Sequence, residues 1–133
     1  MLKHGDSEWT RLPGYSQYAC WSYYGTVGGT LYVFGGAHFS GFALEGGVNL
    51  AQKLTPGIST EWVGIEQIPS DNGGPLARGC TAVLGNTIYA IGGGVPGLKG
   101  GTVNVHAFDT LAETWEANGV VDLPRPQFDC AAA

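Results

Sequence analysis

The sequence predicts an all-β fold, and three observations support this prediction. Glycine and proline interrupt the chain so often that only one stretch of more than a dozen residues, 102–118, lacks both, which leaves little room for a long helix. Two short runs rich in β-forming residues, Thr30–Phe34 and Thr87–Ile91, are bounded by glycines. Tryptophan recurs at a constant interval of 53 residues, at Trp9, Trp62 and Trp115.

Composition restricts the chain to one small domain and limits its partners. The 133 residues carry a net charge of −5, with 6 Lys and Arg against 11 Asp and Glu. Because no basic surface is present to meet phosphates or anionic lipids, we expect neither a nucleic acid nor a membrane as a partner. Glycine contributes 23 residues, yet 11% aromatic residues supply the core material that disordered chains lack. We therefore expect a folded, glycine-punctuated domain.

The sequence also carries predictions about location. No apolar segment follows Lys3, so we expect no secretory signal, and no run of 18 apolar residues is present to span a membrane. The three cysteines form no CxxC pair. We expect a cytoplasmic protein whose thiols are reduced and buried.

Each repeat contains the same features in the same order. An acidic residue accompanies each tryptophan, an apolar–proline pair follows, and a cysteine comes next. In the two complete repeats, a strand that ends in paired glycines follows the cysteine, at residues 30–36 and 87–93. Several features recurring in one order at one period indicate stacked supersecondary units.

The stretch 102–118 is predicted to contain two strands separated by a turn. Val103, Val105 and Ala107 alternate with polar residues, which predicts a strand. The repeat places a turn at Asp109-Thr110, where the Asp side chain is expected to bond the local backbone, and then a short strand through Trp115. We prefer this interpretation to a helix over 111–117, which propensity alone would allow.

These features resemble the kelch repeat, a unit of about 50 residues that forms one four-stranded blade of a β-propeller. The strand–Gly–Gly units 31–36 and 88–93, the pair Phe108-Asp109 with Trp115, and the segment 123–126 carry the resemblance.

The pattern departs from the kelch repeat in two places. No aromatic–Asp pair precedes Trp62, so we expect an irregular third strand at 49–53. The segment from Cys20 to Tyr32 is three residues longer than its counterpart in the next repeat, which we assign to a longer hairpin or a bulge near 25–29.

The resemblance implies an incomplete kelch-type propeller of antiparallel four-stranded blades within one domain, 1–133. Residues 8–13 would form the outer strand of a partial blade, 20–63 and 80–117 two full blades, and 125–133 the first strand of a further blade. About 2.5 repeats fall short of the four to eight blades of closed propellers, and aromatic-rich sheet faces would remain in water. We expect two or three copies to close the ring as a homo-oligomer; the alternative is a fragment of a larger kelch protein.

The cysteines Cys20, Cys80 and Cys130 each follow a proline in the repeat, which places them at one position of the first strand. Equivalent positions in successive blades lie a blade apart, beyond the Cα separation of about 4.4–6.8 Å that a disulfide needs. We therefore expect three packing thiols, and neither a disulfide nor a metal site.

The candidate ligand-binding residues lie where a propeller face is expected. His38 follows paired glycines in a loop between the second and third strands. The segment 21–24 holds three aromatics on both faces of a strand, so one is expected to be exposed for stacking on a sugar or peptide. Two arginines near the cysteines would bind an anion or form a salt bridge between blades. The candidates are Trp21, Tyr24, His38, Phe39, Phe42, Arg78 and Arg125.

The resemblance implies a non-catalytic module that binds a protein, peptide or glycan without a cofactor or metal. An enzyme remains the alternative, because kelch-like propellers include sialic-acid epimerases and a copper-containing galactose oxidase, although the copper ligands cannot be matched here. The segment 92–97 matches G-x-G-x-x-G, but it leads toward a strand and lacks the helix that a dinucleotide site needs. No histidine pair, paired carboxylates or G-x-S-x-G motif supports catalysis.

Overall fold

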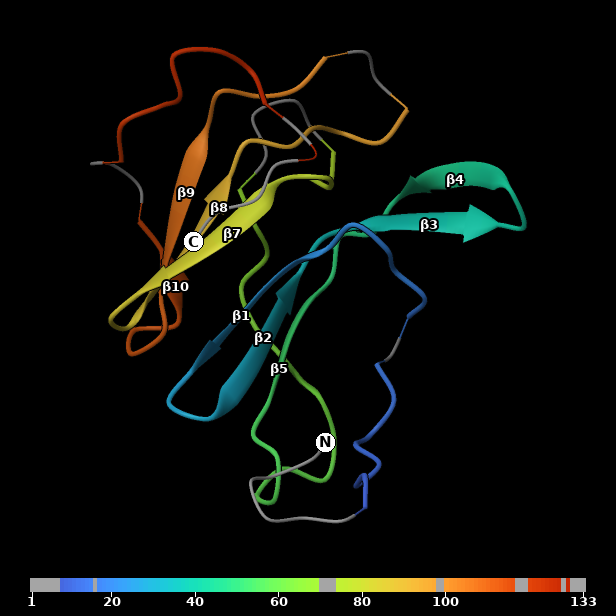
Figure 1. Ribbon diagram of the computed structural model, residues 1–133, viewed down its shortest axis with the longest axis vertical. Coiled ribbons are helices and arrows are strands. Elements are labelled where there is room, and N and C mark those ends of the chain that lie inside the picture. Colours follow the sequence, from blue (N-terminus) through green and yellow to red (C-terminus); the bar gives the residue numbers. More distant parts are fainter. Residues whose placement is uncertain are drawn as a thin grey trace.

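A computed structural model describes residues 8–15, 17–69, 74–97, 100–116, 120–127 and 129. All regular structure in these residues is antiparallel β: two four-stranded sheets and one separate hairpin. Figure 1 shows the two sheets side by side, with the hairpin projecting from the first. None of the described residues forms a helix that could cross a membrane.

The first sheet has the strand order β1-β2-β5-β6 and the second the order β10-β9-β8-β7. The first sheet contains β1 (Tyr23–Val27), β2 (Thr30–Phe34), β5 (Ala51–Leu54) and β6 (Val63–Gly64). The second contains β7 (Cys80–Leu84), β8 (Thr87–Ile91), β9 (Val105–Asp109) and β10 (Thr114–Trp115). The separate hairpin is β3 (Ala37–Ser40) and β4 (Ala43–Gly47).

The central strands of both sheets confirm the sequence predictions, since β2 and β8 span the predicted residues. The β1–β2 connection is the tight turn Gly28-Gly29, with both φ angles positive at 57° and 80°, as a type I′ hairpin requires. Pairing runs without a bulge from Tyr23↔Phe34 to Val27↔Thr30. The expectation of a longer or bulged hairpin near 25–29 is therefore wrong.

The extra residues of the first repeat lie ahead of β1. Cys20 forms an isolated bridge with Ala37, and Ala77 forms the corresponding bridge with Gly94. The residue that matches Cys80 at the start of the sheet is therefore Tyr23, and Cys20 lies three residues before that position.

This shift corrects the prediction for the cysteines. Cys20 is exposed and free, whereas Cys80 is disulfide-bonded. Cys130, the third cysteine of the sequence, lies outside the described residues. The expectation of three reduced, buried thiols at one position of the first strand is therefore wrong for Cys20, which lies ahead of that position and is exposed, and for Cys80, which is disulfide-bonded.

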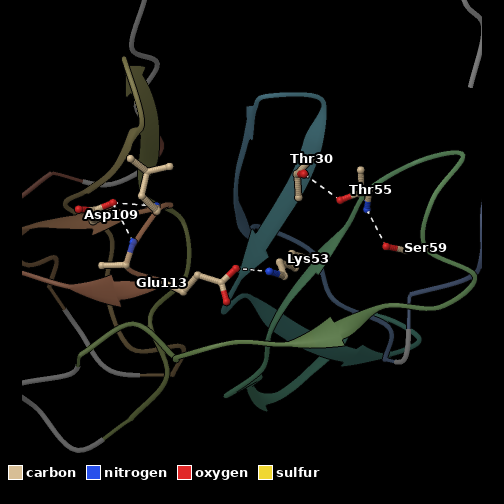
Figure 2. Close-up of polar contacts among 8 residues, drawn as sticks. Thr30, Lys53, Thr55, Ser59, Asp109 and Glu113 are labelled. Carbon is tan, nitrogen blue, oxygen red and sulfur yellow. Dashed lines mark hydrogen bonds and ion pairs between the residues drawn. The ribbon is translucent and has the colours of Figure 1, made fainter.

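The third strands are regular in both sheets. β5 pairs with β2 over four residues, from Leu31↔Leu54 to Phe34↔Ala51, so the expected irregularity is absent from this strand. In the second sheet the predicted turn and short strand are confirmed, because residues 110–113 turn and β10 pairs Trp115 with Phe108. The Asp109 carboxylate accepts backbone N–H bonds from Leu111 and Ala112, which holds this turn (Figure 2).

The main core lies between the two sheets. Gly25 of β1 approaches the second sheet so closely that a Cβ there would meet Val83 and Ile88 at 3.1 Å. Lys53 of β5 forms an ion pair with Glu113 in the turn before β10, which joins the sheets at their margin (Figure 2). The buried cluster comprises Tyr23, Tyr32, Phe34, Ala51, Ile68, Leu76, Ile88, Ala90, Phe108 and Trp115.

Contacts between successive repeats recur with the repeat spacing. The indole N–H of Trp62 donates to the carbonyl of Pro13 at 3.0 Å, and that of Trp115 donates to the carbonyl of Glu66 at 3.1 Å. Each acceptor lies four residues after the tryptophan of the preceding repeat. Residues 8–15 form no strand. The contact of Pro13 with Trp62, next to β6 of the first sheet, nevertheless corresponds to the contact of Glu66 with Trp115 of the second sheet.

A second recurring contact joins the starts of the first strands. The Arg78 amide donates to the carbonyl of Trp21 at 3.0 Å, and the Asp129 amide donates to the carbonyl of Arg78 at 2.7 Å. Trp21, Arg78 and Asp129 share positive φ angles of 57°, 63° and 54°. Three successive repeats therefore place one residue each in an unusual conformation, joined by backbone hydrogen bonds. Of the predicted strand over 125–133, the structure describes only 125–127 and 129.

Candidate functional site

A concave surface lined by aromatic residues lies where the first strands begin. Trp21 and Arg78 precede β1 and β7 by two residues, and their positive φ angles interrupt the extended backbone. Sequence reasoning placed Trp21 and Tyr23 on one face of a strand. The strand begins only at Tyr23, so the backbone turn at Trp21 directs this indole away from the core while Tyr23 is buried.

Aromatic and cationic groups pack around Trp21. The Trp21 and Phe39 rings meet edge to face, with centroids 4.9 Å apart and planes at 84°. The guanidinium carbon of Arg78 lies 4.8 Å from the centroid of the Trp21 ring, within the range of a cation–π interaction. These contacts fix the indole between two neighbours from different elements.

The charge of Arg78 is balanced by Asp129. Arg78 Nε donates to Asp129 Oδ1 at 2.9 Å, and Nη2 donates to the other carboxylate oxygen. This hydrogen bonding raises the pKa of Arg78 and lowers the pKa of Asp129. The sequence allowed two roles for Arg78, anion binding or a salt bridge between repeats. The structure shows the salt bridge, in which the charge of Arg78 is balanced by that of Asp129.

A cavity of about 190 Å³, here called the Trp21 pocket, opens beside these groups. Its volume falls below the roughly 300–1,000 Å³ of sites for drug-sized ligands, and among the described lining residues only Arg78 is charged. The pocket is thus suited to one apolar side chain. Its lining residues are Trp21, Phe39, Leu44, Arg78, Gly94, Val95, Pro96, Gly97 and Gly100.

The structure brings three of the seven predicted site residues together, Trp21, Phe39 and Arg78. His38 does not line this pocket; it forms an ion pair with Glu45 at 2.8 Å and borders a separate hollow with Tyr18. The predicted loop that carries His38 is the β3–β4 hairpin, joined to the end of β2 by Gly35-Gly36.

The other predicted residues lie apart from the pocket. Tyr24 is exposed on the face of β1 opposite the core, Phe42 is fully exposed in the turn between β3 and β4, and Arg125 is exposed near the end of the chain. Sequence reasoning missed Leu44, Pro96 and Asp129. The cysteine spacing does not identify Asp129, because Asp129 precedes Cys130 by one residue, Arg78 precedes Cys80 by two, and Trp21 follows Cys20.

The described residues contain no group of three or more His, Cys, Asp or Glu side chains that could hold a metal ion. The chemistry that the Trp21 pocket offers is apolar contact, ring–ring contact and one paired guanidinium. This arrangement is suited to binding.

One solved structure has a fold similar to that of this chain. No family model matches the chain, and no curated protein matches its sequence. Among solved structures, the one described as "Structure of YjhT" is similar over 90% of this chain, with a TM-score of 0.67 and 18% sequence identity. The chain spans about a third of the length of that protein, 32%. At this identity the likeness shows a shared fold alone.

Proposed function

We propose that the chain is a non-catalytic, protein-binding module made of neighbouring blades of a kelch-type β-propeller, and that further copies of the chain complete the ring. One observation supports this proposal above all: the two sheet faces that point out of the molecule are equivalent to the two faces that pack together inside it.

The first sheet contributes one face to the interface inside the chain. Tyr23, Tyr32 and Phe34 of this face belong to the buried cluster, and Val27 packs against it. The equivalent residues of the second sheet, 57 positions later, point the opposite way, out of the molecule. This β7–β8 outer face consists of Ala82, Leu84, Tyr89 and Ile91; Cys80 has the same orientation but is buried and disulfide-bonded.

The second sheet contributes the other half of the internal interface through the side chains of Thr81, Val83, Ile88 and Ala90. Their equivalents, 57 positions earlier, point out of the first sheet. This β1–β2 outer face consists of Tyr24, Thr26, Leu31 and Val33.

The outer faces are therefore complementary in the way that the inner faces are. A second copy that docks its β1–β2 outer face on the β7–β8 outer face of the first would repeat the strand packing of the internal interface. Residues 19–21 of that copy would have to move aside, because Gln127 and Asp129 of the first chain already bond Gly93 and Arg78 at the equivalent positions. Contacts of this head-to-tail kind are heterologous and form a ring when the rotation closes. The tryptophan contacts agree, because Trp9 occupies the position from which Trp62 and Trp115 reach the preceding repeat, and its side chain is 78% exposed.

The test is the molar mass of the purified chain, measured by light scattering at micromolar concentration. We expect a multiple of 13.9 kDa that corresponds to two or three copies. Leu84 is 72% exposed on one outer face and Tyr24 is 73% exposed on the other, so Leu84→Asp and Tyr24→Asp should each give monomers that still fold. Ile58→Asp is the matched control, because Ile58 is exposed in the turn after β5 and belongs to neither face.

Mixing the two variants gives a sharper result. The Leu84→Asp chain keeps an intact β1–β2 outer face, and the Tyr24→Asp chain keeps an intact β7–β8 outer face. An equimolar mixture should therefore form a heterodimer of about 28 kDa, twice the mass of the chain, although neither variant associates alone. A monomeric wild-type chain, or variants that assemble as the wild type does, would overturn the proposal.

A further inference from the structure

The β3–β4 hairpin is an insertion in the first repeat. It lies between β2 and β5, whereas the described residues between β8 and β9 contain no hairpin at the corresponding place. Its two strands pair only with each other, so neither four-stranded sheet needs the hairpin for its own pairing. Connections that a rigid scaffold carries without needing them are where binding residues concentrate.

A second hollow, here called the His38 hollow, lies between this hairpin and the chain on either side of it, and its volume is about 540 Å³. Unlike the Trp21 pocket, it falls within the roughly 300–1,000 Å³ of small-molecule sites. Backbone hydrogen bonds hold its walls together. Cys20 and Ala37 bond each other reciprocally at 2.9 and 2.7 Å, and the Val48 amide donates to the carbonyl of Gly36 at 2.9 Å. The described lining residues are Gln17, Tyr18, His38, Gly47, Val48 and Asn49.

A β-bulge in the hairpin places a carboxylate against His38. His38 pairs with Gly46, and the next residue of β3, Phe39, pairs with Leu44, so Glu45 is an extra residue in β4. Bulges re-aim side chains beside functional sites. The Glu45 carboxylate lies 2.8 Å from His38 Nδ1, and this contact fixes the orientation of the imidazole. Within the part of the chain that the structure describes, Nε2 has no hydrogen-bond partner, so this nitrogen is available to a ligand.

The other polar groups of the hollow are an exposed ring and two amides. Tyr18 is 90% exposed. Gln17 and Asn49 are also exposed, and their side-chain amides both donate and accept hydrogen bonds. None of the six described lining residues is a lysine, arginine, aspartate or glutamate, and the Glu45 carboxylate is already paired with His38. The lining therefore suits an uncharged ligand that combines hydroxyl groups with an apolar face.

We propose that the His38 hollow binds a neutral saccharide. A pyranose ring presents C–H groups on its faces, which pack on an aromatic ring such as that of Tyr18, and hydroxyl groups at its edge. Because a hydroxyl both donates and accepts, it matches the amides of Gln17 and Asn49 and the Nε2 atom of His38. An anionic ligand would meet no unpaired cation among the described lining residues. The inference goes beyond the protein-binding role proposed above and does not rest on the assembly, since no lining residue belongs to either outer face.

Titration of the ¹⁵N-labelled chain, followed by NMR, tests the inference. The probes are the methyl glycosides of glucose, galactose, mannose and N-acetylglucosamine, each added to about 50 mM, which would saturate a site of millimolar affinity. We expect at least one of them to shift the amide signals of Tyr18, His38 and Asn49. The methyl glycoside of glucuronic acid is the anionic counterpart of the glucoside and should bind no more tightly. Shifts with none of the neutral glycosides, shifts confined to other residues, or tighter binding of the glucuronide would overturn the inference.

Substitutions then test the residues that hold the sugar. Tyr18→Ala should raise the dissociation constant of the tightest glycoside about tenfold or more, whereas Tyr18→Phe, which keeps the ring, should stay within about threefold of the wild type. His38→Ala should raise it about fivefold, since it removes one hydrogen-bond partner. Phe42→Ala is the matched control, because Phe42 is an exposed aromatic residue of the same hairpin that does not line the hollow. A Tyr18→Ala chain that binds as the wild type does would contradict the inference.

The two proposals fail in different ways. The titration is run on the wild type and on Leu84→Asp, which is expected to be monomeric, so that movement of residues 19–21 in an assembly cannot conceal the binding. Glycoside binding by a wild-type chain that stays monomeric would leave the saccharide inference standing and contradict the ring proposal. Assembly of the wild type, with no glycoside bound by either chain, would contradict the saccharide inference and leave the ring proposal standing.

Discussion

Replacing Tyr23 with phenylalanine tests how strongly the interface between the two sheets depends on one buried hydroxyl group. The Tyr23 side chain is 1% exposed, and its hydroxyl donates to the carbonyl of Gly92 in the second sheet at 2.7 Å. The substitution keeps the ring that fills the core and removes only the hydroxyl. The same hydroxyl oxygen accepts a hydrogen bond from the Gly79 backbone N–H, so any loss of stability reports on the contacts of this hydroxyl with both glycines.

The expected magnitude follows from the burial of both partners. A typical intramolecular hydrogen bond contributes about 0.5–1.5 kcal/mol net, and a buried carbonyl left without its partner costs about 1–3 kcal/mol. Because Gly92 is buried, we expect Tyr23→Phe to lower the free energy of unfolding by about 1–2 kcal/mol. With a urea m-value of about 2 kcal/mol/M, the unfolding midpoint should fall by about 0.5–1 M.

The assay is urea unfolding followed by tryptophan fluorescence, at equal protein concentration because assembly contributes to the apparent stability. The control is Tyr18→Phe, which removes a hydroxyl from a residue that is 90% exposed and belongs to neither outer face, and it should change the free energy of unfolding by less than about 0.5 kcal/mol. Equal effects of the two substitutions would refute the reasoning. A loss above about 4 kcal/mol would also refute it, because it would mean that the ring itself had moved.

Two further predictions follow from the cysteines and the tyrosines. In denaturant without reductant, a thiol-alkylating reagent should label Cys20 but not Cys80, and Cys80 should be labelled only after reduction, as read by peptide mass mapping; labelling of Cys80 before reduction would contradict its disulfide. Burial raises the pKa of Tyr15 from 10.0 to about 12 and raises that of Tyr23 further, so both phenols stay neutral in the folded chain after they ionise in the unfolded one. The stability that the two neutral phenols contribute is complete below pH 10 and should be lost as the pH rises from about 10 through about 12. The urea midpoint should therefore fall over this pH range, and it should fall less in Tyr15→Phe. A constant midpoint across the range would contradict the prediction.

Local signals explain what the sequence predicted correctly. Thr30–Phe34 and Thr87–Ile91 combine β-forming residues with glycines at both ends, and the structure places strands over both. The turn after Asp109 was predictable because an Asp side chain bonds the backbone two or three residues ahead, as it does here to Leu111 and Ala112.

The failures concern relations between distant residues. Aligning Cys20 with Cys80 followed from their common order after the tryptophan and the apolar–proline pair, but the bridge of Cys20 with Ala37 moves it out of register with β7. The hairpin over 37–47 was interpreted as a loop, because its strands are short and pair only with each other and because the segment contains three glycines. Of the candidate site, the sequence identified Trp21, Phe39 and Arg78, but could not separate them from four residues that lie elsewhere.

The sequence by itself determined that the chain is built of β-strands and repeats, because strand propensity, glycine turns and tryptophan spacing act over a few residues or recur along the chain. Only the tertiary structure decided which face of each strand is buried, which rings meet at Trp21, and that Arg78 is neutralised by Asp129. These outcomes depend on how the backbone turns ahead of β1 and β7 and on which segments then lie within contact distance. Residues 51 or 57 positions apart become neighbours only when both sheets have folded and packed.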